Sequence, residues 1–183
     1  KDLSQLVKER GPLPATKAIE CVIQAARGFE FAHRQGVVHR DIKPANLLLD
    51  KQGTVKILDM GLARLEGSGN DVTQAELTGT GQIMGTVDFM APEQAMSTKS
   101  ADARSDVYSL GITLWYLMTG KVAYDGETLM AKLMAHQQAP IPKLSDVCPE
   151  TSAELDETFE RMVAKKPGNR LQTMTDVLAR LEA

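Results

Sequence analysis

The stretch VVHRDIKPANLLLD, Val37 to Asp50, decides how this chain is interpreted, because an acid, a cation and an amide stand close together between two apolar runs. Asp41 can accept a proton from a hydroxyl group, Lys43 brings a positive charge close to it, and Asn46 offers a neutral oxygen suited to a hard cation. Downstream, Asp59 follows a predicted strand and precedes a glycine, a place suited to a metal-binding carboxylate. This set favours phosphoryl transfer, which needs an oriented hydroxyl, metal ions and positive charge more than covalent help from the protein.

Composition and charge limit the class of protein around that stretch. The chain has 183 residues, of which 43% are hydrophobic and 25% charged, as is typical of one soluble globular domain. A formal net charge of -3 without blocks of like charge gives no long-range attraction to nucleic acid or to an anionic membrane. No run approaches the roughly 18 apolar residues of a membrane span, and the opening KDLSQLVKERG lacks the apolar region of a signal peptide. Partners must therefore be argued from individual sites.

The two cysteines indicate the redox compartment. Cys21 and Cys148 lie far apart, without a CxxC motif or a nearby pair of histidines, which predicts two reduced thiols and neither a disulfide framework nor a zinc site. We therefore expect a cytoplasmic protein.

Hydrophobic periodicity predicts a mainly helical domain with one small β-hairpin. Asp2 is expected to cap a short helix through Lys8, and Thr16 a longer helix that Gly36 ends. NLLLDKQGTVKIL, residues 46–58, predicts two short strands joined by a turn. From residue 67 to residue 81 the sequence is small, polar and aperiodic, which predicts a mobile loop. SDVYSLGITLWYLMTG, residues 105–120, is apolar on nearly every side and predicts a central buried helix.

Five motifs, in this order along the chain, carry a resemblance to a known family. HRDIKPAN, ILDMGLAR, GTVDFMAPEQ, SDVYSLG and KKPGNR together resemble a eukaryotic-like serine/threonine protein kinase, and the resemblance covers essentially the whole chain. It implies the α+β protein kinase-like fold, here as a mainly α C-terminal lobe with a short β-hairpin at the catalytic loop. Residues 1–183 would form this partial catalytic domain, with residues 59–93 as the activation segment.

The family also needs a Gly-rich loop and a strand lysine paired with a helical glutamate, and neither precedes Asp41. We therefore expect the chain to be an excised piece in which the N-terminal β lobe is absent, its position lying directly upstream of Lys1. Such a lobe is expected to have little activity alone.

The resemblance assigns the catalytic roles residue by residue. It implies that Asp41 is the catalytic base, that Lys43 neutralises the transferring phosphoryl group, and that Thr86 orients both. Asn46 and Asp59 would hold Mg²⁺ for bound ATP. Taken singly, an aspartate or asparagine here would be a turn or cap residue; the joint set favours catalysis.

Further residues are implied for nucleotide binding and packing. Leu48 matches the floor of the adenine pocket, and Asp2 resembles the acidic residue that bonds ribose, although a helix cap explains it equally well. By residue type His39 is a candidate general base, but the resemblance makes it a buried packing and hydrogen-bonding residue. Met60 stands where the family usually has phenylalanine, a departure that an adaptable side chain can fill.

Regulatory and structural roles follow from the same resemblance. Arg40 would pair with a phosphorylated side chain of the activation segment, for which Thr78 and Thr80 are the candidates and Thr73 a neighbour; a hydroxyl-rich surface loop is the alternative. Asp106 reads as the N-cap of the apolar helix, and the family adds that its carboxylate bonds to the catalytic-loop backbone. Glu93 and Arg170 resemble a structural ion pair.

Three functions remain open from the sequence. The first is an ATP-dependent serine/threonine kinase acting on protein substrates, favoured by the complete motif set and by GTVDFMAPE, which looks like a peptide-docking segment. The second is a non-catalytic interaction module, and the third a small-molecule phosphotransferase. In each case the exposed apolar face that would meet the other lobe predicts self-association. A membrane tether of the natural protein outside this segment is compatible with all three.

Overall fold

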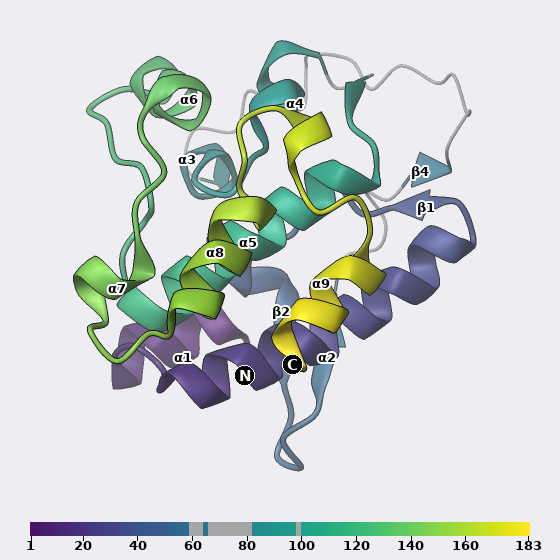
Figure 1. Ribbon diagram of the computed structural model, residues 1–183, viewed down its shortest axis with the longest axis vertical. Helices are drawn as coiled ribbons and strands as arrows, with labels where there is room; N and C mark the ends of the chain where they lie inside the picture. The colour runs from purple at the N-terminus through teal and green to yellow at the C-terminus, as the bar shows by residue number, and fades with distance from the viewer. Residues whose placement is uncertain (59–63, 66–81, 98–99) are drawn as a thin grey trace.

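The fold is mainly helical, with two two-stranded sheets at its edge (Figure 1). The computed structural model describes residues 1–58, 64–65, 82–97 and 100–183. The helices are α1 (Leu3–Arg10), α2 (Ala15–Arg34), α3 (Gln82–Val87), α4 (Pro92–Met96), α5 (Ala103–Thr119), α6 (Leu129–Gln138), α7 (Leu144–Val147), α8 (Ala153–Met162) and α9 (Met174–Leu181). Short 3₁₀ turns cover η1 (Pro44–Asn46) and η5 (Pro167–Asn169), and the strands are β1 (Val37–Val38), β2 (Leu47–Leu49), β3 (Val55–Ile57) and β4 (Arg64–Leu65). The expected fold class is confirmed.

Helix α5 runs through the middle of the molecule, and the other large helices pack around it (Figure 1). Fourteen of its residues are buried, as predicted from its apolar sequence. Helix α2 packs against α5 and α9, and α8 packs against α5 with the Trp115 and Phe159 rings stacked at 5.7 Å. Gly111 permits this approach, since a Cβ atom there would lie 2.6 Å from Val163 Cγ1.

The helix ends show where local signals were right and where they were wrong. Asp2 caps α1 as expected, with its Oδ1 accepting from the Gln5 amide at 2.8 Å. Thr16 does not cap α2, because the helix already begins at Ala15 after Pro14, whose φ of -52° suits that position. Gly36, at φ +73°, follows the end of α2 and donates its amide to His33 O.

The cap of α5 corrects a second prediction. Asp102, not Asp106, is the N-cap residue, and its carboxylate accepts from the Arg104 amide at 2.8 Å. Asp106 lies in the first turn of the helix, where its exposure is 0%. Its carboxylate is therefore available for contacts outside the helix.

The predicted hairpin is β2 paired antiparallel with β3, in a register that places Leu48 opposite Lys56. Asp50 shapes the turn by accepting the Gln52 and Thr54 amides, each at 2.9 Å. The chain start runs beside this hairpin through an antiparallel bridge between Asp2 and Leu48. The hairpin thus brings the two predicted nucleotide-binding residues together.

Three further expectations concern the whole chain. Cys21 and Cys148 are free thiols, as predicted. In the described part of the chain, none of the helices combines the length and apolar character that crossing a membrane requires. The loop expected between residues 67 and 81 lies outside the described residues.

Candidate active site

The predicted catalytic residues converge beside the short turn η1. Lys43 Nζ lies 2.9 Å from Asp41 Oδ2 and donates to Thr86 Oγ1 at 2.7 Å. Asn46 Nδ2 donates to the Asp41 carbonyl oxygen at 2.8 Å and to Asp41 Oδ2 at 3.1 Å. The structure therefore brings together a carboxylate, an ammonium group, an amide and a hydroxyl from residues as far apart in sequence as 41 and 86.

The charges and polar contacts of Asp41 single out one of its oxygens. Within the described residues, both polar contacts of its carboxylate go to Oδ2, so Oδ1 is the oxygen that can face an incoming hydroxyl group. The side chain of Asp41 is 12% exposed, so most of it is shielded from bulk water. Such a carboxylate can orient a hydroxyl and take up its proton.

Asp106 on α5 binds the backbone of the predicted catalytic loop, which carries Asp41. Its Oδ2 accepts from the His39 amide and its Oδ1 from the Arg40 amide, both at 2.8 Å. These are the contacts that the family resemblance implied for Asp106. Arg40 has φ +68°, a strained value for a side chain of this size, and the two hydrogen bonds offset the strain of that geometry.

His33 and Gln94 also hold the loop, and sequence reasoning missed both. His33 Nε2 lies 2.7 Å from Asp106 Oδ2, so an imidazole from α2 contacts the carboxylate that binds the loop. Gln94 Nε2 donates to the Arg40 carbonyl at 2.9 Å, while its Oε1 accepts from the Ala91 amide at 3.1 Å. Gln94 belongs to the quoted motif GTVDFMAPEQ, so a signal for it was present in the sequence; His33 carried no such signal.

His39 is buried, as the resemblance implied. It is 1% exposed, its ring packs edge-on against Phe29 with centroids 5.4 Å apart, and its Nδ1 accepts from the Asp41 amide at 3.3 Å. Its Nε2 lies 3.2 Å from the Leu58 carbonyl. With both nitrogens directed at backbone groups, the ring supports the loop and is not placed to receive a substrate proton.

Only part of the expected metal and nucleotide site lies in the described residues. Asp59 and Met60 lie outside them, and the residues that are described contain no group of three or more histidine, cysteine, aspartate or glutamate side chains placed to hold a metal ion. Asn46 uses its amide nitrogen in both of its hydrogen bonds to Asp41, so neither bond occupies its side-chain oxygen, the atom that could serve as a ligand for a hard cation.

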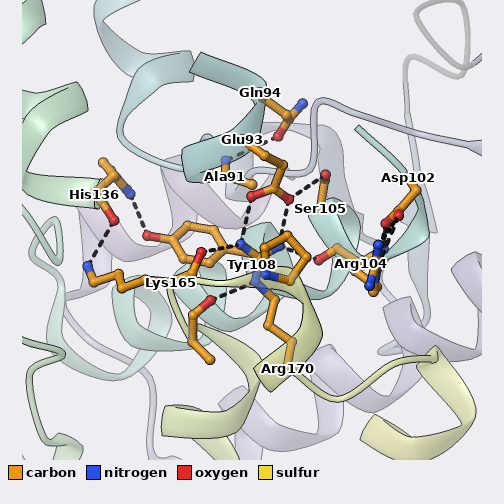
Figure 2. A network of polar contacts seen from close by, with 12 residues as sticks. Ala91, Glu93, Gln94, Asp102, Arg104, Ser105, Tyr108, His136, Lys165 and Arg170 are labelled. Atoms are coloured by element: carbon orange, nitrogen blue, oxygen red, sulfur yellow. Dashed lines mark hydrogen bonds and ion pairs between the residues drawn. The ribbon is translucent and has the colours of Figure 1, made fainter. Parts of the chain in front are cut away.

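Glu93 and Arg170 form the predicted ion pair (Figure 2). Arg170 Nη1 lies 2.6 Å from Glu93 Oε1 and Arg170 Nη2 lies 2.7 Å from Glu93 Oε2, a bidentate arrangement. Burial raises the pKa of Glu93, but the hydrogen bonds and charge of Arg170 outweigh it and leave that pKa below its ordinary value. Glu93 is therefore ionised at neutral pH and ties α4 to the residues before α9.

Of the residues in the regulatory prediction, the structure describes Arg40 but not the threonines. Arg40 Nη2 donates to the Ala101 carbonyl at 3.1 Å, and Arg40 Nε is buried without a hydrogen-bond partner among the described residues. Thr73, Thr78 and Thr80 lie outside the described residues.

Comparison with known proteins gives one family and a set of bacterial relatives. A family described as "Protein kinase domain" matches residues 1–180. The chain is 39% identical over 184 residues to the serine/threonine-protein kinase PknB of Mycolicibacterium smegmatis, and 39% identical over 181 residues to PknB of Mycobacterium tuberculosis; each alignment covers 98% of this chain and 28% of the relative. A probable serine/threonine-protein kinase PknB of Lactococcus lactis is 34% identical over 179 residues, covering 96% of this chain and 27% of that protein. The chain thus spans little more than a quarter of these relatives.

Proposed function

The chain belongs to the protein kinase domain family, and we propose that the natural protein containing it transfers the γ-phosphoryl group of magnesium-bound ATP to serine or threonine hydroxyls of proteins. The single observation that carries this proposal is the joint placement of Asp41, Lys43, Asn46 and Thr86 around one point. A scaffold has no chemical need for all four. We further propose that residues 1–183 form the C-terminal lobe, with the activation segment at residues 59–93.

In this mechanism the chain acts mainly by positioning. Asp41 Oδ1 accepts the hydrogen of the acceptor hydroxyl and holds its oxygen for attack. Lys43, fixed between Asp41 and Thr86, supplies positive charge where negative charge develops on the transferring group. Because Asp106 and Gln94 fix the loop backbone, these groups need no rearrangement when the substrate arrives.

The cofactor that this proposal requires is ATP with Mg²⁺, and the residues present suit it. Asn46 would provide an oxygen ligand to the metal, together with Asp59. When bound, the metal ion would offset the negative charge of the phosphates. Leu48 would contact the adenine, and Asp2, whose Oδ1 is used in capping α1, would offer Oδ2 to a ribose hydroxyl.

A regulatory step is proposed on the same site. The Arg40 side chain, with its buried Nε unpartnered among the described residues, is suited to pair with a phosphate on Thr78 or Thr80. Such a phosphate would order the activation segment against the catalytic loop.

The test compares the natural protein with its Asp41→Ala variant in transfer of labelled γ-phosphate to a generic protein substrate. We expect the substitution to reduce the rate by about 10²–10⁴-fold, the usual contribution of a general base. Asp146→Ala, which removes an exposed carboxylate on α7, serves as the matched control and should retain the rate. Equal rates for the Asp41→Ala variant and the unmodified protein would refute the assignment. Absence of transfer in both the unmodified protein and the Asp41→Ala variant would favour an interaction module. Transfer to small molecules alone would favour a small-molecule phosphotransferase.

A further inference from the structure

A buried ion pair joins helix α6 to the segment that precedes α4. Lys132 Nζ lies 2.6 Å from Asp88 Oδ1, and the two residues are 7% and 9% exposed. Burial raises the pKa of Asp88 above its ordinary value, and the hydrogen bond and charge of Lys132 offset only part of that rise. Removing one partner of a pair so far from water strongly destabilises the folded protein, because the other charge remains buried. It therefore fixes the distance between α6 and Asp88.

His136 lies one turn further along α6, on the same face as Lys132. It is 1% exposed, and its Nδ1 lies 2.7 Å from the hydroxyl of Tyr108 on α5. Burial, followed by the charge of Lys165, lowers the pKa of His136 to about 4, so the ring is neutral at pH 7. Lys132 thus binds the side chain of Asp88, while His136 binds Tyr108 and holds α6 against α5.

The same cluster continues to the Glu93–Arg170 ion pair (Figure 2). The Arg170 guanidinium carbon lies 4.9 Å from the centroid of the Tyr108 ring, and Lys165 Nζ donates to the His136 carbonyl at 2.9 Å. Helix α6 is therefore attached through Tyr108 and Lys165 to the anchor of α4, as well as directly to Asp88. These contacts come from α5, α6 and the segment before α9, which leaves α6 little freedom to shift.

Asp88 belongs to the segment that forms a wall beside Asp41. Thr86, Phe89 and Met90 of this segment line a small hollow together with Asp41. In the proposed reaction the acceptor hydroxyl would reach Asp41 beside this wall. The segment is held at Thr86 by Lys43, at Asp88 by Lys132 and at Glu93 by Arg170.

We propose that Lys132 and His136 are positioning residues for the acceptor: Lys132 holds Asp88 directly, and His136 holds α6 in place through Tyr108, so that together they fix the segment from Thr86 to Glu93 in the shape that presents a protein hydroxyl to Asp41. This inference rests on the proposed kinase function. It assigns to α6 a part in the reaction, although none of its residues contacts the reacting atoms.

The experiment measures two rates in the natural protein: phosphate transfer to a protein acceptor, and hydrolysis of ATP by water, which needs no acceptor positioning. Lys132→Met keeps an unbranched side chain that is one atom shorter and removes its charge, while Asp88→Asn keeps the size and removes the opposite charge. His136→Gln keeps a hydrogen-bond acceptor for Tyr108. Lys143→Met, an exposed lysine preceding α7, is the matched control.

For Lys132→Met, Asp88→Asn and His136→Gln we expect kcat/KM for the protein acceptor to fall about tenfold or more, a loss typical of misplaced reactants, with ATP hydrolysis reduced less than about threefold. The double variant Lys132→Met/Asp88→Asn should lose no more than either single variant, because both remove one interaction. Should Lys132→Met fail to fold by circular dichroism, Asp88→Asn decides.

Equal reductions of the two rates would overturn the inference, because they would show only a smaller folded fraction. Unchanged acceptor transfer in all three variants would overturn it as well, while leaving the proposed function intact. Absence of transfer in the unmodified protein would overturn both.

Discussion

Loss of Glu93 should be the most damaging single change in charge within the described residues. Arg170 is 2% exposed, and it donates two hydrogen bonds to Glu93 and one each to the carbonyls of Ala164, Arg104 and Lys165. Glu93→Gln would leave this guanidinium buried without an anion and turn an amide NH₂ toward one of its donors. Because breaking a buried pair by removing one partner costs about 3–5 kcal/mol, we expect a loss of that size.

The consequence for unfolding can be stated in degrees. For a domain of 150–250 residues, the size range of this chain, each kcal/mol shifts Tm by about 2–4 °C, so the expected fall in the Tm of the domain is about 6–20 °C. The assay is thermal and urea unfolding of the natural protein and of Glu93→Gln at pH 7. The matched control is Glu20→Gln, which removes the exposed Lys17–Glu20 pair and should cost about 1 kcal/mol or less.

The pH dependence gives an independent reading of the same pair. Glu93 has a folded pKa below its ordinary value of 4.5, so its contribution to stability is fully present above pH 4.5 and is lost as the pH falls through the folded pKa. The unmodified protein should therefore lose more stability than Glu93→Gln as the pH falls below 4.5. A Glu93→Gln variant no less stable than Glu20→Gln would refute the reasoning that this pair is desolvated and coupled.

Two further predictions concern acid and phosphate. His136, with its folded pKa at about 4, takes up its proton in the unfolded chain near pH 6.5 and in the folded chain only near pH 4, so stability should fall by about 3 kcal/mol across that interval. The charged and titratable groups around the ring are Lys132, Lys165, Asp88, Tyr108 and Tyr124. Urea unfolding measured from pH 7 to pH 4 should show this loss of stability in the unmodified protein but not in His136→Gln. The same dependence of stability on pH in both proteins would contradict the prediction. In active natural protein, mass spectrometry should find phosphate on Thr78 or Thr80, and its absence from residues 71–86 would rule out the proposed pairing with Arg40.

The sequence was sufficient for elements whose signal is local. A sequence that is apolar on nearly every side predicted the buried helix α5, and two short apolar runs joined by a turn around Asp50 to Gly53 predicted the hairpin of β2 and β3. The resemblance then placed Asp41, Lys43 and Asn46, because spacing within one short loop limits where the side chains can lie. The contact of Lys43 with Thr86 spans 43 residues, and its prediction rested on the resemblance alone.

What the sequence could not supply depends on packing between distant elements. Asp106 looked like a helix cap because an acid at the start of an apolar run usually is one, yet Asp102 takes the cap and leaves Asp106 to the loop backbone. The Asp88–Lys132 pair joins residues 44 positions apart, and neither residue type indicates burial. Such pairs become visible only when α6 has been placed against the segment before α4.

The contacts of α5 explain how an apolar helix can determine the geometry of the proposed catalytic site. Asp106 on this helix holds the loop backbone at Arg40, and Tyr108 reaches His136 and the Arg170 guanidinium. Both side chains leave a helix whose apolar residues are packed on all sides, and a densely packed core does not deform continuously. The loop that carries Asp41 and the wall beside it are thus both held in place by one rigid element, α5. It follows that the shape of the site depends on core packing around α5 as much as on the residues that touch the substrate.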